Sequence, residues 1–352
     1  MTEYFELEWQ KFQNTSEEAK LAFFQKEGRI FDILFARQFE RKQLDFLSNL
    51  ATKIRLVAKR KEGADYLRRL LTHKKAMLYF VQPSTRTYLS FLNACHILGI
   101  KTSDIRDTFT SSEIKGESSY DTIRTFSSYV DVIISRHPEK DFNQKAAWLL
   151  NSTDRPIPVV NAGSGKDEHP TQALLDIYTL HRSFEHRGGI DGKVITMVGD
   201  LKRGRTIRSL SFLMKEYKNM KLYFIAPKHL MIEEDLRSFL KKSRIEFYET
   251  DNFASVIAQS DAIYMTRIQD EHDNDKEKTQ SSYDDFSFTY EHLSILKKDA
   301  VIMHPLPRRN EIDVRVDSDE RAVYWRQERN GMWIRAALLA YIFHVEKSIL
   351  DV

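Results

Sequence analysis

The chain of 352 residues has almost no cysteine: Cys95 stands alone, so no intrachain disulfide can form. This excludes the small disulfide-stapled secreted proteins and favours a reducing compartment. An excess of one charge sign is also lacking, because 54 Lys and Arg residues face 51 Asp and Glu residues. The resulting net charge of +3 is too small to indicate a nucleic-acid-binding or membrane-surface protein.

Long hydrophobic runs are missing as well. The longest apolar run, residues 336–343, has eight residues, whereas a transmembrane helix needs roughly 20. The N-terminus is acidic where a secretory signal would be basic. The hydrophobic content of 41% and charged content of 30% are ordinary for a folded protein. We therefore expect a soluble cytoplasmic protein that binds neither membrane nor nucleic acid.

What the sequence does contain is an alternation of short β-rich segments with segments of helical periodicity. This alternation is typical of a parallel sheet covered by helices. Strands are expected at residues 76–81, 131–135, 158–161, 193–198, 221–226, 261–265 and 300–304. Several are apolar throughout, as strands buried on both faces tend to be. The predicted fold class is α/β, with two similar domains, each a parallel sheet flanked by helices.

The length predicts about two domains, at roughly 150 residues each. A polar stretch at 185–192 contains three glycines and follows a helix expected at 171–180, so we place the junction there. The expected parts are an N-terminal helical extension at 1–33, a first domain at 34–184 and a second at 185–330. A final helix at about 331–352 is expected to pack back on the first domain. Residues 270–286 are polar and lack apolar periodicity, which indicates an exposed loop.

The first candidate for chemistry is Ser84-Thr85-Arg86-Thr87, which stands between an expected strand and a helix that Gly99 ends. Hydroxyl groups, the open N–H groups of a helix start and a guanidinium would converge there on a phosphate or similar oxyanion. Ser84 or Thr85 could instead be only an N-cap. Arg86 favours the anion site, because a cation in the first turn opposes the helix dipole.

Three further candidates belong to the same expected domain. Lys115 precedes a glycine in the polar stretch 111–121, where it could deliver a positive charge or simply lie in a solvated loop. Arg136 follows an apolar strand, and ligands of open α/β sheets bind at the carboxyl ends of strands. His169 precedes a proline at an expected helix start, so its ring can point away from the helix toward a site. Gln172 lies one turn further on, roughly on the same side. His169 could instead be a structural cap of the helix.

The expected second domain carries three more candidate segments, each directly after an expected strand. Arg205 follows a strand in a segment that nearly matches a Walker phosphate loop, but it occupies the position of the Walker lysine. Arg267 follows another strand. Two prolines stiffen the turn after a third, at residues 304–308, and leave carbonyl groups open to accept hydrogen bonds. No nucleophilic cysteine or acid–base carboxylate pair stands out, and the histidines lack metal-ligand spacing. We expect a cleft that binds and orients anions without a metal or a covalent intermediate.

From about Phe35 to the C-terminus, these segments in this order resemble the aspartate/ornithine carbamoyltransferase family, and within it the aspartate carbamoyltransferases. The matching segments are STRT at 84–87, KGES at 115–118, RHP at 136–138, NAG at 161–163, HPTQALLD at 169–176, GDLKRGRT at 199–206, YMTRIQ at 264–269 and HPLPRRNEI at 304–312. The last two favour aspartate over ornithine as the acceptor.

The resemblance implies an enzyme that transfers the carbamoyl group of carbamoyl phosphate to the α-amine of L-aspartate. The products would be N-carbamoyl-L-aspartate and phosphate, in an early step of de novo pyrimidine synthesis, with no cofactor. The resemblance also implies that the first domain binds carbamoyl phosphate and the second binds aspartate. Lys115 and Ser111 would come from a neighbouring subunit, so a homotrimer with shared active sites would be the smallest active unit.

Residue roles follow from the same resemblance. The catalytic residues would be Arg86, Thr87, Lys115, Arg136 and His169. Carbamoyl phosphate would be bound by Ser84, Thr85, Arg86, Thr87, Ser111, Arg136, His169, Gln172, Leu306 and Pro307, the last two through their carbonyl groups. Aspartate would be bound by Lys115, Arg205, Arg267 and Gln269. Thr87, Arg136 and His169 would polarise the carbamoyl oxygen as negative charge builds on it.

Some features depart from the family pattern. Tyr88 and Ile114 stand where relatives carry basic residues, and residues 1–33 have no counterpart in compact members. A carbamoyltransferase for another amine and a catalytically silent scaffold relative stay open as alternatives, as does a nucleotide-binding switch on the 199–206 loop. The sequence does not indicate whether regulatory chains bind.

Overall fold

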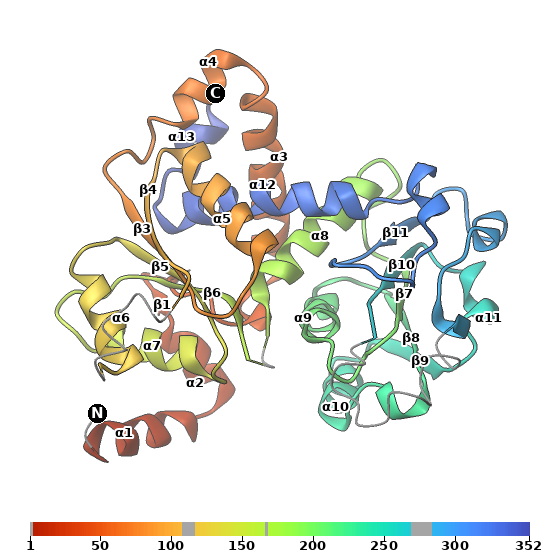
Figure 1. Ribbon diagram of the computed structural model, residues 1–352, viewed down its shortest axis with the longest axis horizontal. Coiled ribbons are helices and arrows are strands. Elements are labelled where there is room, and N and C mark those ends of the chain that lie inside the picture. The colour runs from red at the N-terminus through yellow and green to blue at the C-terminus, as the bar shows by residue number, and fades with distance from the viewer. Residues whose placement is uncertain (1–2, 108–116, 166–167, 269–283) are drawn as a thin grey trace. The chain divides into compact units, whose positions relative to one another are not determined.

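The computed structural model describes residues 3–107, 117–165, 168–268 and 284–352. The chain forms two compact units (Figure 1). Unit 1 contains Met1–Thr171 and Gly331–Val352, and unit 2 contains Gln172–Asn330. The chain passes from one to the other within helices α8 (Pro170–Phe184) and α12 (Tyr324–Ile342). We expected the first boundary after α8, at 184/185. The compact units divide near the start of α8, and Asp176 farther along this helix hydrogen-bonds to Tyr264 within unit 2.

Unit 1 is built on a four-stranded parallel sheet in the order β4-β3-β5-β6. Its strands are β3 (Lys75–Phe80), β4 (Lys101–Ile105), β5 (Val132–His137) and β6 (Val159–Ser164). Its helices are α3 (Arg41–Val57), α4 (Lys61–Leu67), α5 (Thr85–Leu98), α6 (Ser119–Ser127), α7 (Phe142–Asn151) and the terminal α13 (Glu346–Leu350). The two central strands are buried along nearly their whole length, which matches their apolar sequences.

Helix α5 illustrates how local sequence sets these elements. Ser84 is its N-cap and Gly99 ends it in the left-handed conformation, with φ of 78°. A Cβ at position 99 would lie 1.9 Å from the carbonyl oxygen of Arg68, so glycine is required for space as well as for conformation. The buried positions Phe91, Cys95 and Leu98 follow helical spacing. The predicted start and end of this helix are thus confirmed.

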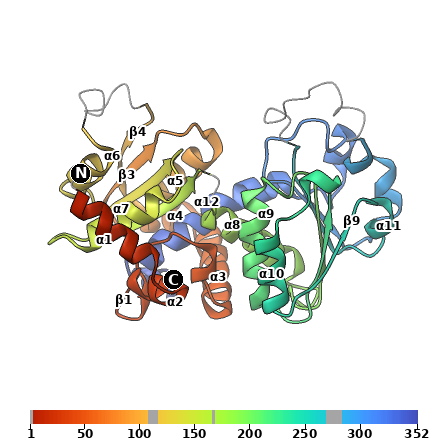
Figure 2. The same cartoon turned by 90° about the horizontal axis from the view of Figure 1, so that it is seen from below.

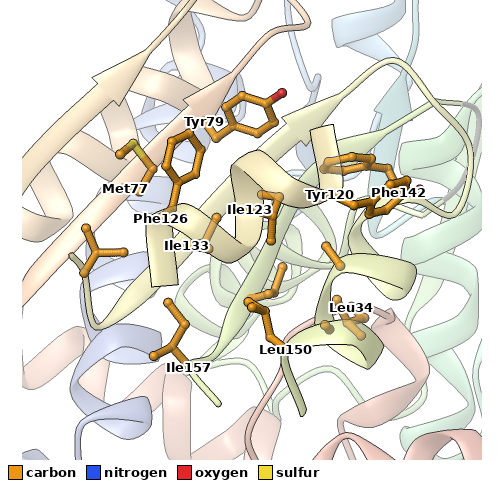
Figure 3. Close-up of a cluster of buried hydrophobic side chains, with 14 of the residues drawn as sticks. Leu34, Met77, Tyr79, Tyr120, Ile123, Phe126, Ile133, Phe142, Leu150 and Ile157 are labelled. Carbon is orange, nitrogen blue, oxygen red and sulfur yellow. The ribbon is translucent and has the colours of Figure 1, made fainter. Parts of the chain in front are cut away.

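The core of unit 1 lies between one face of the sheet and helices α6 and α7. Figure 3 shows Tyr79 and Ile133 from the strands facing Ile123, Phe126 and Leu150 from the helices. All five are at most 8% exposed. This cluster anchors the strand ends at which the candidate site residues lie.

Unit 2 is built on a five-stranded parallel sheet in the order β11-β10-β7-β8-β9. Its strands are β7 (Val194–Val198), β8 (Lys221–Ile225), β9 (Glu246–Thr250), β10 (Ala262–Met265) and β11 (Val301–Met303). Besides α8, its helices are α9 (Arg205–Leu213), α10 (Glu234–Lys242) and the short α11 (Ala254–Ile257). A second apolar cluster, which includes Phe253, Ile263 and Ile302, packs against this sheet.

The predicted fold class is confirmed, and a strand lies at each of the seven predicted positions. The sequence did not predict β4 and β9, which lie at the edges of their sheets and carry mostly polar residues. The single C-terminal helix expected at 331–352 is instead two helices, α12 and α13, and α12 begins at Tyr324. None of the described helices combines the length and apolar character that crossing a membrane requires.

The N-terminal extension consists of α1 (Glu3–Gln13), α2 (Glu17–Phe23) and a short hairpin of β1 (Gln25–Lys26) and β2 (Arg29–Ile30). Figure 2 shows α1 beside α7. Aromatic rings hold the two together: the ring centroid of Trp148 on α7 lies 4.9 Å from Phe5 and 5.5 Å from Trp9. Glu6 also forms an ion pair with Lys145 of α7. The helices expected at 1–33 are present, and their aromatic residues explain why they pack on unit 1.

Candidate active site

The candidate phosphate loop of unit 1 begins just beyond the end of β3. Ser84 has extended backbone angles as the N-cap of α5, but its hydroxyl accepts no hydrogen bond from the first turn of this helix, which the structure describes throughout. Ser84 therefore occupies the N-cap position of α5 without a side-chain capping hydrogen bond. Thr85 is exposed, Arg86 is half-buried and Thr87 is 8% exposed. The loop presents three hydroxyls and a guanidinium at a helix N-terminus, as an oxyanion site needs.

Arg136 lies at the carboxyl end of β5, next to the candidate phosphate loop. It pairs with Phe80 of β3, and its carbonyl oxygen accepts a 3.2 Å hydrogen bond from the backbone N–H of Gln82. Its Nη1 donates to the carbonyl of Ala162 at 3.1 Å. Two adjacent strands thus fix the backbone and the guanidinium of Arg136 within two residues of the loop that carries Arg86.

His137 follows Arg136 but points to the opposite face of the sheet, as strand alternation requires. Its ring stacks on Phe142 with 3.7 Å between centroids, and its Nδ1 accepts from the N–H of Glu139 at 3.1 Å. Burial lowers the pKa of His137 to about 4. This histidine is neutral at pH 7 and belongs to the core, while Arg136 stays a candidate for the site.

His169 lies just before Pro170, the first residue of α8, and is 4% exposed. Its Nδ1 is 3.5 Å from the hydroxyl of Thr171. The neighbouring residue is held by Asn161 of β6, whose side-chain N–H group donates to the carbonyl of Glu168 at 3.3 Å. The Asn161 side-chain oxygen accepts from Gly163 at 2.7 Å. Asn161 therefore fixes the backbone beside His169. In the sequence it stood out only as part of the segment NAG at 161–163, with no role of its own.

In unit 2, the two candidate aspartate-binding arginines lie at the carboxyl ends of neighbouring parallel strands. Arg205 is the first residue of α9, after β7, and Arg267 follows β10, which pairs with β7. Thr266 donates to the carbonyl of Val198 from both its N–H and its hydroxyl, at 2.8 and 2.9 Å. The two loops are thereby joined at one edge of the sheet.

Gly199 makes this junction possible. Its φ is 119°, and a Cβ there would lie 2.1 Å from the carbonyl oxygen of Thr266. Only glycine can take this conformation at this separation. The near-match to a Walker loop is therefore a turn that brings the β7 and β10 ends together, with Gly204 as the N-cap of the following helix.

The turn after β11 is built around His304. Its Nδ1 accepts from the backbone N–H of Leu306 at 2.7 Å, so the ring proton resides on Nε2, which lies 2.7 Å from Glu311. Burial opposes the ionisation of Glu311, but hydrogen bonding to His304 prevails and keeps the pKa of Glu311 below its usual value. The Leu306–Pro307 peptide is cis. His304 and Glu311 thus hold the two carbonyls predicted to contact the carbamoyl nitrogen.

A buried carboxylate ties this turn to the rest of unit 2. Asp176 of α8 is fully buried and accepts from Gln172 at 3.1 Å, from Gln327 at 2.7 Å and from the Tyr264 hydroxyl at 2.8 Å. Gln327 in turn accepts from the backbone N–H of His304 at 2.9 Å. Asp176 therefore fixes Gln172 and, through Gln327, the turn after β11. The sequence contained Asp176 in a motif but did not reveal this role.

The predicted site residues thus fall into three groups. Unit 1 carries Ser84, Thr85, Arg86, Thr87, Arg136 and His169. Unit 2 carries Gln172, Arg205, Arg267, Leu306 and Pro307. Ser111, Lys115 and Gln269 lie outside the described residues. Within the described part of the chain, no group of three or more His, Cys, Asp or Glu side chains is placed to hold a metal ion.

Residues 32–182 match the carbamoyl-P binding domain of the aspartate/ornithine carbamoyltransferases, and residues 191–342 match their Asp/Orn binding domain. The chain belongs to the aspartate/ornithine carbamoyltransferase family. The predicted family is confirmed, and with it the prediction that the chain is a carbamoyl-group transferase.

Individual members of the family agree with this assignment. The chain is 38% identical to the chloroplastic aspartate carbamoyltransferase of Arabidopsis thaliana, over 89% of this chain and 78% of the relative. It is 42% identical to the aspartate carbamoyltransferase catalytic subunit of Clostridium novyi, over 76% of this chain and 85% of the relative.

Solved structures of the family have the same fold. The catalytic subunit of M. jannaschii aspartate transcarbamoylase superposes with a TM-score of 0.79 at 35% identity, covering 89% of this chain and 98% of that one. The Trypanosoma cruzi enzyme in complex with carbamoyl phosphate and aspartate gives 0.77 at 35% identity, covering 88% and 94%. The first 31 residues of this chain precede the family match, so the N-terminal extension is a feature outside it.

Proposed function

We propose that this carbamoyltransferase uses L-aspartate as its acceptor and forms N-carbamoyl-L-aspartate and phosphate from aspartate and carbamoyl phosphate. The observation that carries the proposal is the placement of Arg205 and Arg267 at one edge of the unit 2 sheet. Two guanidinium groups match the two carboxylates of aspartate, whereas an amine with one carboxylate, or none, does not offer a carboxylate to each of them. The names of the relatives described above point to the same acceptor.

The phosphate of carbamoyl phosphate binds at the start of α5. Ser84, Thr85 and Thr87 supply hydroxyls and Arg86 supplies charge, while the first N–H groups of the helix point toward the same oxyanion. The same groups stabilise the phosphate that leaves at the end of the reaction. This part of the site needs no metal, because the arginine and the helix N-terminus supply the positive charge.

The carbamoyl oxygen is polarised by Thr87, Arg136 and His169. When the neutral α-amine of aspartate attacks the carbonyl carbon, the C=O π electrons move to this oxygen and a tetrahedral intermediate forms. The C–O bond to phosphate then breaks, its electron pair leaves with the phosphate, and the amine loses a proton. Groups fixed in advance around the oxygen stabilise the charge that develops, so orientation and electrostatics supply the rate enhancement.

Gln172 and the carbonyls of Leu306 and Pro307 hold the carbamoyl nitrogen. The two carbonyls can only accept hydrogen bonds, and an NH₂ group has two to donate. Their turn is held by His304 and Glu311, so the position of the carbamoyl group depends on residues that do not touch it.

Lys115 and Ser111 complete the site from a neighbouring subunit, and the active unit is a homotrimer in the cytoplasm. A mixing experiment tests this part. A Lys115→Ala chain and an Arg86→Ala chain, each inactive alone, regain part of the activity in mixed trimers, because some sites then receive both intact residues. Confirmed mixed trimers without any recovery would contradict shared sites.

The acceptor assignment is tested at Arg267. Replacing it with Ala removes a charge-assisted contact to a carboxylate, so we expect the KM for aspartate to rise about 10–150-fold, with little change in the KM for carbamoyl phosphate. Arg309→Ala is the matched control, since Arg309 is exposed in the loop after the β11 turn and has no assigned contact with substrate. Equal effects of Arg267→Ala on both substrates would contradict the assignment.

A further inference from the structure

The N-terminal extension reaches the segment that carries His169 through a pair of ionic contacts. Glu17, the first residue of α2, lies 2.7 Å from Nη1 of Arg37. Arg37 belongs to a short 3₁₀ turn, η1 (Ala36–Gln38). Its Nη2 lies 3.3 Å from Oε1 of Glu168, the residue before His169. One guanidinium therefore bridges a carboxylate of the extension and a carboxylate adjacent to the proposed catalytic histidine.

Glu168 is held from several sides. Its carboxylate is 9% exposed, and Oε2 accepts a 2.6 Å hydrogen bond from the backbone N–H of Ala36. Its carbonyl accepts from the side chain of Asn161, which also donates to the carbonyl of Leu34 at 3.1 Å. Both the side chain and the main chain of Glu168 are thus connected to residues 34–37. A carboxylate this buried depends on its cation, because an unpaired buried charge is costly.

We propose that Arg37 and Glu168 are positioning residues for His169. Glu17 of the N-terminal extension supports them by holding the guanidinium of Arg37. The inference rests on the proposed role of His169 at the carbamoyl oxygen. His169 lies between Glu168 and Pro170, so its backbone has little freedom once Glu168 is fixed. A displaced His169 loses its contact with the charge that develops in the transition state. The effect therefore falls on kcat more than on either KM.

The three residues contribute unequally. The carboxylate of Glu168 is buried, while that of Glu17 is 57% exposed. Glu17 and Arg37 also line a cavity of about 280 Å³ together with Gln13 and Lys20, so water and salt reach their ion pair. We expect Glu168→Gln and Arg37→Ala to lower kcat about 10–100-fold, and Glu17→Gln about 2–5-fold.

Glu6 provides a matched control. It also belongs to the extension and forms an ion pair with a cation of unit 1, but that cation is Lys145 on α7 rather than Arg37. Glu6→Gln makes the same chemical change as Glu17→Gln and weakens the docking of the extension in a similar way. It should lower the melting temperature and leave kcat unchanged.

The experiment measures kcat, both KM values and the melting temperature of the full chain and its variants. The expected pattern is a lowered kcat with nearly constant KM for Glu168→Gln, partial recovery in Arg37→Lys relative to Arg37→Ala, and no added effect of Glu17→Gln when Arg37 is already Ala. The last result separates action through Arg37 from a general loss of stability.

If the wild-type enzyme is active, any one of three outcomes would overturn this inference and leave the proposed function standing. They are an unchanged kcat in Arg37→Ala and Glu168→Gln, equal losses of kcat in Glu6→Gln and Glu17→Gln, and additive losses in the double variant. Should Glu168→Gln fail to fold, Arg37→Lys and Glu17→Gln carry the test. A folded wild-type chain that forms no N-carbamoyl-L-aspartate would overturn the proposed function, and this inference with it.

Discussion

The carboxylate of Asp176 accepts a 2.8 Å hydrogen bond from the hydroxyl of Tyr264, and both groups are fully buried. Burial, together with the negative charge of Asp176, raises the pKa of Tyr264 well above its usual value, so the tyrosine stays protonated and donates. Tyr264 stands three residues before Arg267, and Asp176 four residues after Gln172. One buried hydrogen bond thus links the strand that ends near the proposed aspartate site to the helix that carries a proposed carbamoyl contact.

This relationship predicts a stability cost that an exposed tyrosine does not share. Tyr264→Phe removes one of the hydrogen bonds to a buried carboxylate and should lower the free energy of unfolding by about 1–3 kcal/mol. Tyr248→Phe is the matched control, because its exposed hydroxyl also donates to a carboxylate, Glu246, at 2.8 Å. Urea unfolding should show less than about 0.5 kcal/mol for this control. Equal losses would contradict the importance assigned to burial.

Asp32 gives a prediction for alkaline pH. It is fully buried, and this burial raises its pKa to about 7, although hydrogen bonds from Val159 and Asn151 act in the opposite direction. The folded state therefore holds a proton that the unfolded state has released above about pH 4. Asp32 stabilises the fold fully below that pH, and its contribution is lost as the pH rises through about 7.

The variant Asp32→Asn removes this titration. Its amide can accept from Val159 as the carboxylate does, and a flipped Asn151 can accept from its NH₂ group. Relative to wild type, we expect the variant to gain roughly 2–3 kcal/mol of unfolding free energy between pH 5 and pH 8.5. Denaturant titrations at the two pH values measure this difference. A constant difference between variant and wild type would contradict the raised pKa.

His137 changes the stability of the fold with pH in the opposite direction to Asp32. Its folded-state pKa of about 4 lies below the ordinary value of 6.5, so the unfolded state binds a proton first as the pH falls. The contribution of His137 to stability is present above pH 6.5 and is lost as the pH falls toward 4. His137→Asn keeps an acceptor for the N–H of Glu139 but cannot titrate. Between pH 8.5 and pH 5 the wild type should lose roughly 2 kcal/mol more than this variant, which the same titrations test. Parallel pH curves would show that His137 is accessible to protons in the folded state.

Much of the fold could be predicted from the sequence because the central strands are buried on both faces. Their continuous apolar runs, such as 132–134, have no other simple explanation. The edge strands β4 and β9 have the sequences KTSDI and EFYET, and each has three exposed and two half-buried positions. An edge strand is covered incompletely, so its sequence resembles that of a loop.

The residues of the candidate site also differ in how well the sequence predicts them. Residues that would touch substrate follow strand ends or start helices, so their local sequence marks them, as it does for Arg86 and Arg267. Residues that position them are recognisable only once distant segments are packed together. Asp176 connects to Gln327 across 151 positions in the sequence, and Glu168 connects to Ala36 across 132. One signal was available for Asp176: an acidic residue within the apolar stretch Ala-Leu-Leu-Asp-Ile of a helix must be buried with partners.

Transfer of the carbamoyl group to aspartate is tested most directly by measuring the ureido product that the purified chain forms from carbamoyl phosphate. L-aspartate, L-ornithine and putrescine are offered in parallel, and product is expected with aspartate alone. Product with ornithine or putrescine would leave the carbamoyl phosphate half of the site in place and contradict the assignment of Arg205 and Arg267. A folded chain that forms no product with any of the three would contradict the proposed carbamoyl transfer altogether.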